Sequence, residues 1–89
     1  MNLNANWALQ IDQEVFKSLK KIPQHYAKRI LSVIDTIPFN PFYGDIQKMQ
    51  SEENTWRRRV GAYRIFYEVI PNGKIIYVFR VERRTSKIY

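Results

Sequence analysis

The sequence predicts an α+β domain in which a helical hairpin covers one face of a small antiparallel sheet, in the order β-α-α-β-β-β. Three observations predict this fold class. Apolar residues at helical spacing occupy the first half of the chain, and strand-like alternation of apolar and polar residues occupies the second half. The length of 89 residues suits one small hydrophobic core, so residues 1–89 are expected to form a single domain.

The first three elements follow from apolar spacing and from helix end signals. Residues 6–11 form the first predicted strand, because large apolar residues alternate there with small or polar ones. Asp12 is a favourable helix N-cap, and the apolar spacing after it predicts a short helix over about 13–21. Pro23 ends that helix and suits the first turn of the next, which is predicted over about 23–37.

The second half of the chain is predicted to contain strands and turns. A proline-rich loop ends the second helix, and a short strand is expected at residues 46–49. A β-hairpin follows, with arms at 56–60 and 63–70 and a tight turn at Gly61 and Ala62. The sequence Pro-Asn-Gly then forms a turn before the last strand, and a polar tail ends the chain. The last strand spans 75–81 and the tail spans 82–89.

The net charge of +7 is concentrated in the last third of the chain. Residues 1–55 hold six basic and six acidic residues, whereas residues 56–89 hold nine basic and two acidic ones, and seven of these nine are arginine. Arginine presents a planar fork of donors that suits phosphate and stacks on bases. A solvated basic surface is one interpretation; the clustering in one segment favours a binding site for a polyanion.

The predicted hairpin carries four of these arginines. Arg57 and Arg59 are two residues apart, so both side chains point to one face of a strand. These two and Arg64 would be costly to bury without partners, so they are expected to face solvent or a ligand. Arg58 lies in the opposite phase and is expected on the helix-covered face or at its edge. Basic residues that keep a strand edge from aggregating are the alternative explanation.

Several function classes find no support in the sequence. There is no cysteine, which removes thiolate chemistry and fits a reducing cytoplasm. The single histidine, His25, sits in the first turn of the second predicted helix and is expected to be a surface residue. No metal site, cofactor site or phosphate-binding glycine loop is expected. No apolar run is long enough to span a membrane, and the N-terminus does not resemble a signal peptide.

Two strings of residues then carry a family resemblance. The hairpin reads R-x-R-V-G-x-Y-R-x-x-Y, and the tail reads R-R-x-x-x-x-Y. With the order of elements, these strings resemble the RelE/ParE toxin superfamily, the toxin halves of toxin–antitoxin pairs. The resemblance covers nearly the whole chain. It implies mRNA cleavage in the ribosomal A site for the RelE branch, or inhibition of DNA gyrase for the ParE branch.

The resemblance also implies which residues act. The paired cations before the turn fall on Arg57 and Arg59, and the arginine after the tyrosine of the turn falls on Arg64. The late arginine falls on Arg83 or Arg84, of which Arg84 is preferred, and the C-terminal tyrosine falls on Tyr89. These five positions are the expected catalytic set: Arg57, Arg59, Arg64, Arg84 and Tyr89. Further RNA contacts are expected from Arg58, Arg83 and Lys87.

The expected mechanism is a metal-independent attack of the RNA 2′-hydroxyl on the neighbouring phosphate. Arginine stays cationic in proteins and makes a poor base, so Tyr89 is the best candidate for the base. The expected partners are mRNA, the ribosome and a cognate antitoxin protein. Two alternatives stay open at this point: a ParE-like toxin that inhibits gyrase without cleaving RNA, and a nucleic-acid-binding module without toxicity.

Overall fold

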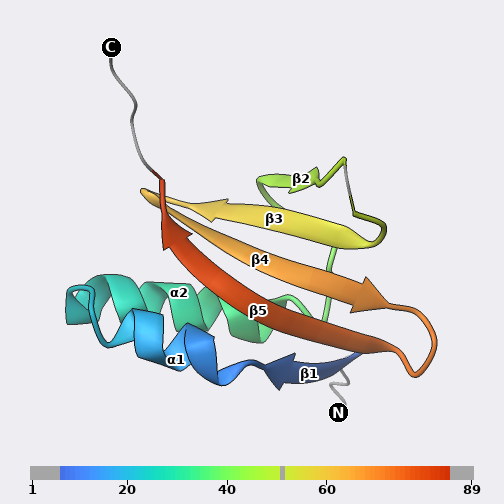
Figure 1. Ribbon diagram of the computed structural model, residues 1–89, viewed down its shortest axis with the longest axis horizontal. Helices are drawn as coiled ribbons and strands as arrows, with labels where there is room; N and C mark the ends of the chain where they lie inside the picture. Colours follow the sequence, from blue (N-terminus) through green and yellow to red (C-terminus); the bar gives the residue numbers. More distant parts are fainter. Residues whose placement is uncertain (1–6, 51, 85–89) are drawn as a thin grey trace.

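A computed structural model of the chain describes residues 7–50 and 52–84. A short strand, two helices and four further strands follow one another along the chain, and both helices lie on one side of a five-stranded sheet (Figure 1). The elements are β1 (Ala8–Ile11), α1 (Gln13–Leu19), α2 (Gln24–Thr36), β2 (Ile46–Lys48), β3 (Thr55–Val60), β4 (Tyr63–Ile70) and β5 (Ile75–Arg83). The predicted α+β class and the order of its elements are therefore confirmed.

The sheet has the strand order β1-β5-β4-β3-β2. Strands β2 to β5 pair antiparallel as predicted, but β1 runs parallel to β5, with Ala8 opposite Ile75. The sheet is thus mixed rather than wholly antiparallel. Alternation along a strand identifies the strand and its buried face, but it does not identify the partner or its direction, so the sequence did not reveal this pairing.

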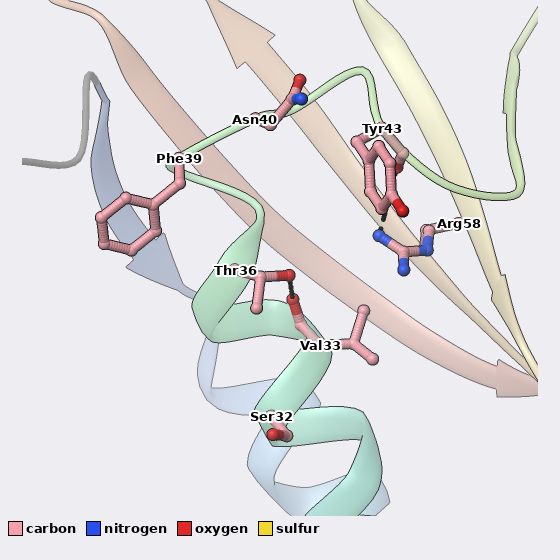
Figure 2. Close-up of a pocket in the computed structure, with 7 residues that line it drawn as sticks. All are labelled: Ser32, Val33, Thr36, Phe39, Asn40, Tyr43 and Arg58. Atoms are coloured by element: carbon pink, nitrogen blue, oxygen red, sulfur yellow. Dashed lines mark hydrogen bonds between the residues drawn. The ribbon is translucent and has the colours of Figure 1, made fainter.

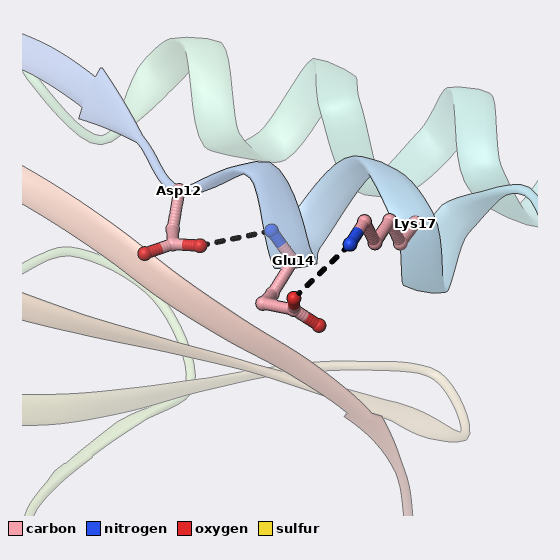
Figure 3. Close-up of polar contacts among 3 residues, drawn as sticks. All are labelled: Asp12, Glu14 and Lys17. Atoms are coloured by element: carbon pink, nitrogen blue, oxygen red, sulfur yellow. Dashed lines mark hydrogen bonds and ion pairs between the residues drawn. The ribbon is translucent and has the colours of Figure 1, made fainter.

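The start of α1 is fixed by Asp12, as its position before the helix predicted. Its carboxylate accepts a hydrogen bond of 2.9 Å from the backbone N–H of Glu14, and Glu14 forms an ion pair of 3.5 Å with Lys17 (Figure 3). The Tyr77 hydroxyl on β5 donates a hydrogen bond to the second oxygen of the same carboxylate. Asp12 therefore caps the helix and ties it to the last strand.

The core lies between the helices and the sheet. Apolar side chains spaced along α1 and α2 meet the alternate residues of β4 and β5 that point toward them. Its most buried members are Val15, Ile30, Ile34, Ile37, Ile65, Tyr67, Ile76 and Val78. Since the helices cover only one side of the sheet, the residues of opposite phase line a face without helices (Figure 1), here called the open face. On β3, β4 and β5 it carries Thr55, Arg57, Arg59, Arg64, Phe66, Glu68, Tyr77, Phe79, Arg80 and Glu82.

Regular alternation in β5 is interrupted once. Phe66 of β4 lies opposite Arg80, but the next residue, Tyr67, lies opposite Val78, so the pairing register shifts by one residue. Phe79 is the extra residue of this β-bulge. Val78 and Val81 are both buried in the core, whereas the two residues between them are not. The bulge therefore turns Phe79 and Arg80 together onto the open face.

No helix in residues 7–50 or 52–84 is both long and apolar enough to cross a bilayer.

Candidate nucleic-acid interface

The hairpin of β3 and β4 brings three predicted site residues together on the open face. Arg59 lies directly opposite Arg64, next to the turn at Gly61. Arg57 is two residues farther along β3 on the same face, opposite Phe66. Neighbouring strands lie about 4.8 Å apart, and residues two apart in one strand are separated by about 6.7 Å. Three guanidinium groups therefore rise from one small area of the sheet.

Polar residues beside β3 orient two of these cations. The Arg59 Nε atom lies 3.5 Å from the Asp45 carboxylate, and Arg57 donates a hydrogen bond to the side-chain oxygen of Gln47 on β2. The Arg59–Asp45 pair is exposed, and water weakens such pairs, so it leaves the guanidinium available to a phosphate. Among the described residues, no carboxylate lies within ion-pair distance of Arg64.

The end of β5 adds to the same area. Glu82 lies opposite Arg64, and the Arg84 backbone N–H donates a hydrogen bond of 2.6 Å to the carbonyl of Ala62, so pairing continues just past the strand. Alternation assigns Arg84 to the side of Glu82 and Arg64, and it assigns Arg83 to the side of the buried Tyr63. The predicted residues Lys87 and Tyr89 lie outside the described part of the chain.

The structure separates Arg58 from the other arginines. Its position opposite Ile65 confirms the predicted opposite phase, and it runs along the side of the sheet that faces the helices. Its Nη1 atom donates a hydrogen bond of 3.2 Å to the carbonyl of Tyr43. A Cβ atom at Gly44 would lie 2.5 Å from the Arg58 Cζ atom, so the loop passes closely over this side chain. Arg58 is therefore not positioned to share an RNA ligand with the open face.

Arg58 instead borders a hollow between the end of α2 and the loop that follows it (Figure 2). The hollow has a volume of about 500 Å³, and its lining is mostly apolar. Seven residues line it: Ser32, Val33, Thr36, Phe39, Asn40, Tyr43 and Arg58. It lies on the helix side, so it is not part of the arginine cluster.

One further cation of the open face was missed at the sequence level. The Arg80 guanidinium lies over the Phe66 ring, with its Cζ atom 4.4 Å from the ring centroid, and its Nε atom is 3.2 Å from a Glu82 oxygen. The signal was present in the sequence as a break in alternation, because Val78 and Val81 both belong to the core although they are three residues apart. Strict alternation would have assigned Arg80 to the helix side.

Comparison with known proteins identifies the family to which this arrangement belongs. The sequence profile described as the ParE toxin of the type II toxin–antitoxin system parDE matches residues 9–88. The chain belongs to the RelE/ParE family of toxins. Toxin RelE3 of Methanocaldococcus jannaschii is 40% identical over 74 residues, which cover 79% of this chain and 82% of that protein. The RelE1 protein of the same organism is 29% identical over 79 residues, covering 85% and 88%.

Solved structures of RelE toxins share the fold of this family member. The RelB–RelE antitoxin–toxin complex from Methanococcus jannaschii matches with a TM-score of 0.69 and 33% identity, covering 83% of this chain and 88% of that one. The archaeal RelE–RelB complex from Pyrococcus horikoshii OT3 matches with a TM-score of 0.78 and 24% identity, covering 92% and 99%. In this RelE/ParE toxin, the fold places three of the four hairpin arginines on the side of the sheet that the helices leave uncovered: Arg57, Arg59 and Arg64.

Proposed function

We propose that this RelE/ParE toxin is an endoribonuclease that cleaves mRNA on the ribosome. The observation that carries the proposal is the pairing of β3 with β4, which sets Arg59 opposite Arg64 with Arg57 on the same face. Three cations in one small area suit the phosphate of a single RNA linkage. The curated relatives are named as RelE proteins, which supports the RelE branch of the family.

The chemistry requires little from the protein beyond positioning and charge. RNA supplies its own nucleophile, the 2′-hydroxyl, which attacks the adjacent phosphorus in line with the departing 5′-oxygen. Negative charge grows on the phosphoryl oxygens during this step. Arg57, Arg59 and Arg64 bind these oxygens and stabilise that charge, and such preorganised electrostatics is often the largest single contribution to catalysis.

Two protons must also move. A base removes the proton of the 2′-hydroxyl, and the leaving 5′-oxygen must be protonated or neutralised. An arginine side chain holds its proton too tightly to act as the base. By resemblance to the family, Tyr89 takes that role. Arg84 neutralises the charge on the leaving 5′-oxygen, and water supplies the proton that this oxygen gains. The products are a 2′,3′-cyclic phosphate and a 5′-hydroxyl.

The proposal includes two partners. Among the described residues, the open face carries no compact base such as histidine, so cleavage of free RNA is expected to be slow and the ribosome orients the substrate. A cognate antitoxin binds the toxin and neutralises its basic face through an acidic or apolar segment. Support comes from the solved relatives, several of which are complexes of RelE with RelB.

Primer extension on mRNA from translating ribosomes tests the proposal directly. The wild-type chain is expected to produce new 5′ ends within codons, and Arg64→Ala is expected to lower the cleavage rate by about 100-fold or more, as loss of one charge-stabilising donor does. Tyr89→Phe tests the assigned base in the same assay. Lys28→Ala, on the exposed face of α2, is the matched loss of a cation elsewhere and should leave cleavage unchanged.

One observation favours a second candidate function. The matching family profile is described by the ParE toxin, and members of the ParE branch inhibit DNA gyrase. Growth inhibition accompanied by DNA-damage signalling, with mRNA intact, would establish that function and exclude the nuclease. The retained arginines of the hairpin, together with the C-terminal tyrosine, favour RNA cleavage.

A further inference from the structure

Arg80 and Phe66 form a stacked pair beside the proposed cleavage site. Phe66 points to the open face yet is only 3% exposed, because the Arg80 guanidinium lies across its ring at 4.4 Å. Phe79 borders the pair, with its ring centroid 5.8 Å from the same guanidinium and 6.3 Å from the Phe66 ring. The outer side of the guanidinium is left toward solvent, since about half of the Arg80 side chain is exposed.

Two features hold this guanidinium in place. The β-bulge at Phe79 puts Arg80 on the open face rather than in the core. Glu82, two residues along β5, forms an ion pair with Arg80, with one carboxylate oxygen 3.2 Å from the Arg80 Nε atom, so it lies beside an edge of the guanidinium. A planar cation that lies over an aromatic ring, has a carboxylate beside its Nε atom and keeps about half of its side chain exposed can accept a further flat group.

The position of the pair relates it to the scissile phosphate. Across β3, β4 and β5, Arg57, Phe66 and Arg80 form one row, and Arg59, Arg64 and Glu82 form the next. The backbones of Arg57 and Arg80 are therefore about 10 Å apart, two strand spacings. A nucleotide whose phosphate lies among the hairpin arginines can extend its base, or the base next to it, across this distance.

We propose that the exposed face of Arg80 is a stacking platform for an RNA base next to the cleaved linkage. Nucleobases stack on arginine planes as well as on aromatic rings, and this contact accepts any base. Phe66 and Glu82 act as positioning residues, because they fix the guanidinium that meets the base. This inference rests on the proposed function, since it assigns one subsite of the same RNA site.

The test compares two ligands that carry the same charge. One is a fluorescein-labelled single-stranded RNA oligonucleotide made uncleavable by 2′-deoxy substitution, and the other is the same oligonucleotide without bases. Fluorescence anisotropy gives the affinity ratio of the two for the wild-type chain, Arg80→Lys and Arg80→Met. Lysine keeps the positive charge but lacks the planar guanidinium. Methionine can still cover the Phe66 ring but lacks both the charge and the planar group. Lys74→Met, at the β4–β5 turn, is the matched loss of a cation away from the pair.

The wild-type chain and Lys74→Met are expected to prefer the base-bearing strand by roughly tenfold or more, as stacking on one side chain does. Arg80→Lys and Arg80→Met should lose most of that preference at an unchanged melting temperature. A preference that survives in Arg80→Lys, or one absent from the wild-type chain, overturns the proposal. If neither variant folds, the Arg80 Nε–H proton resonance of the wild-type chain decides, because a stacked base shifts it and the baseless strand does not.

The same experiment separates this inference from the proposed nuclease function. Binding of an uncleavable strand does not require catalysis, whereas primer extension on ribosomes does. If the wild-type chain cleaves mRNA while the preference for base-bearing RNA does not depend on Arg80, the nuclease function is supported and base stacking on Arg80 is refuted. If base preference depends on Arg80 but the wild-type chain does not cleave mRNA, base stacking on Arg80 is supported and the proposed nuclease function is refuted.

Discussion

Tyr67 shows what a single buried side chain does for the molecule. It lies on β4 facing the helices, is 1% exposed, and donates a hydrogen bond from its hydroxyl to the carbonyl of Pro41. That bond ties the loop after α2 to the centre of the sheet. Burial raises the pKa of Tyr67 to about 12, against a smaller opposing effect of the Arg58 charge.

The raised pKa predicts how alkali acts on the fold. A folded pKa of about 12 lies above the ordinary value of 10.0, so the neutral hydroxyl stabilises the folded state fully below pH 10 and loses this contribution as pH rises toward 12. Tyr67→Phe should cost about 1–3 kcal/mol at pH 7, because the Pro41 carbonyl loses its partner. Its free energy of unfolding should then fall less than that of the wild-type chain between pH 10 and 12.

Urea unfolding at a series of pH values measures the cost of Tyr67→Phe at pH 7 and the loss of stability between pH 10 and 12. Tyr43→Phe removes a hydroxyl from an exposed tyrosine and is the matched control, expected to follow the wild-type chain. If the free energy of unfolding falls equally in the wild-type chain and in Tyr67→Phe between pH 10 and 12, the buried hydroxyl is not the cause of the alkaline loss of stability.

At the scale of elements, the sequence predicted what depends on local pattern. Spacing within a few residues predicted both helices, the hairpin, and the faces to which Arg57, Arg58 and Arg59 point. The structure confirms these predictions. The parallel pairing of β1 with β5 joins residues more than 60 positions apart, and nothing local encodes it. In the sequence, the bulge that reorients Arg80 appears only as a break in alternation. The pairing of β5 with β4 is needed to explain that break.

The start of α1 predicts an acid-dependent contribution to stability. The Tyr77 hydroxyl and then the Glu14 backbone N–H donate to Asp12, and these hydrogen bonds lower the pKa of its carboxyl. A lowered pKa means that the stabilisation is present above the unfolded value of about 4 and is lost as pH falls through the folded value. Asp12→Ala should lower the stability of the folded chain at pH 7, because the substitution removes the oxygen that caps α1.

Thermal unfolding between pH 2 and pH 7 checks this expectation. The difference between the wild-type chain and Asp12→Ala should shrink as the pH falls below about 4. Asp12→Asn retains an oxygen that can cap the helix. Its stability at pH 7 should therefore lie between those of the wild-type chain and Asp12→Ala, and its capping contribution should depend little on pH. A constant difference across the whole range would exclude the carboxylate as its source.

The whole molecule separates its charge by region and by face. The first 55 residues carry balanced charge, and the excess lies in the segment that forms β3, β4 and β5. The sheet then places most of these arginines on the side away from the helices, with Arg58 and Arg83 as the exceptions. We therefore expect a polyanion to be drawn to the open face rather than to the helices.

This asymmetry predicts how salt affects RNA binding. Removing one cation that binds a phosphate should reduce the slope of log K against log salt by about 0.7 for a single strand. Arg64→Gln should produce this reduction, because its guanidinium belongs to the cluster. Lys28→Gln removes the same charge from α2 and should leave the slope unchanged. Equal slopes for the two variants, measured by anisotropy from low to moderate salt, would mean that binding is not localised on the open face.

The place of β1 has a consequence for how the chain folds. Because β1 joins the sheet only beside β5, its sheet hydrogen bonds require the last strand of the sheet to be in place. These contacts join residues 67 positions apart, such as Ala8 and Ile75, and a high proportion of distant contacts slows folding. During synthesis, β1 therefore has no partner strand until residues 75–83 have been made, which is after the arginine hairpin.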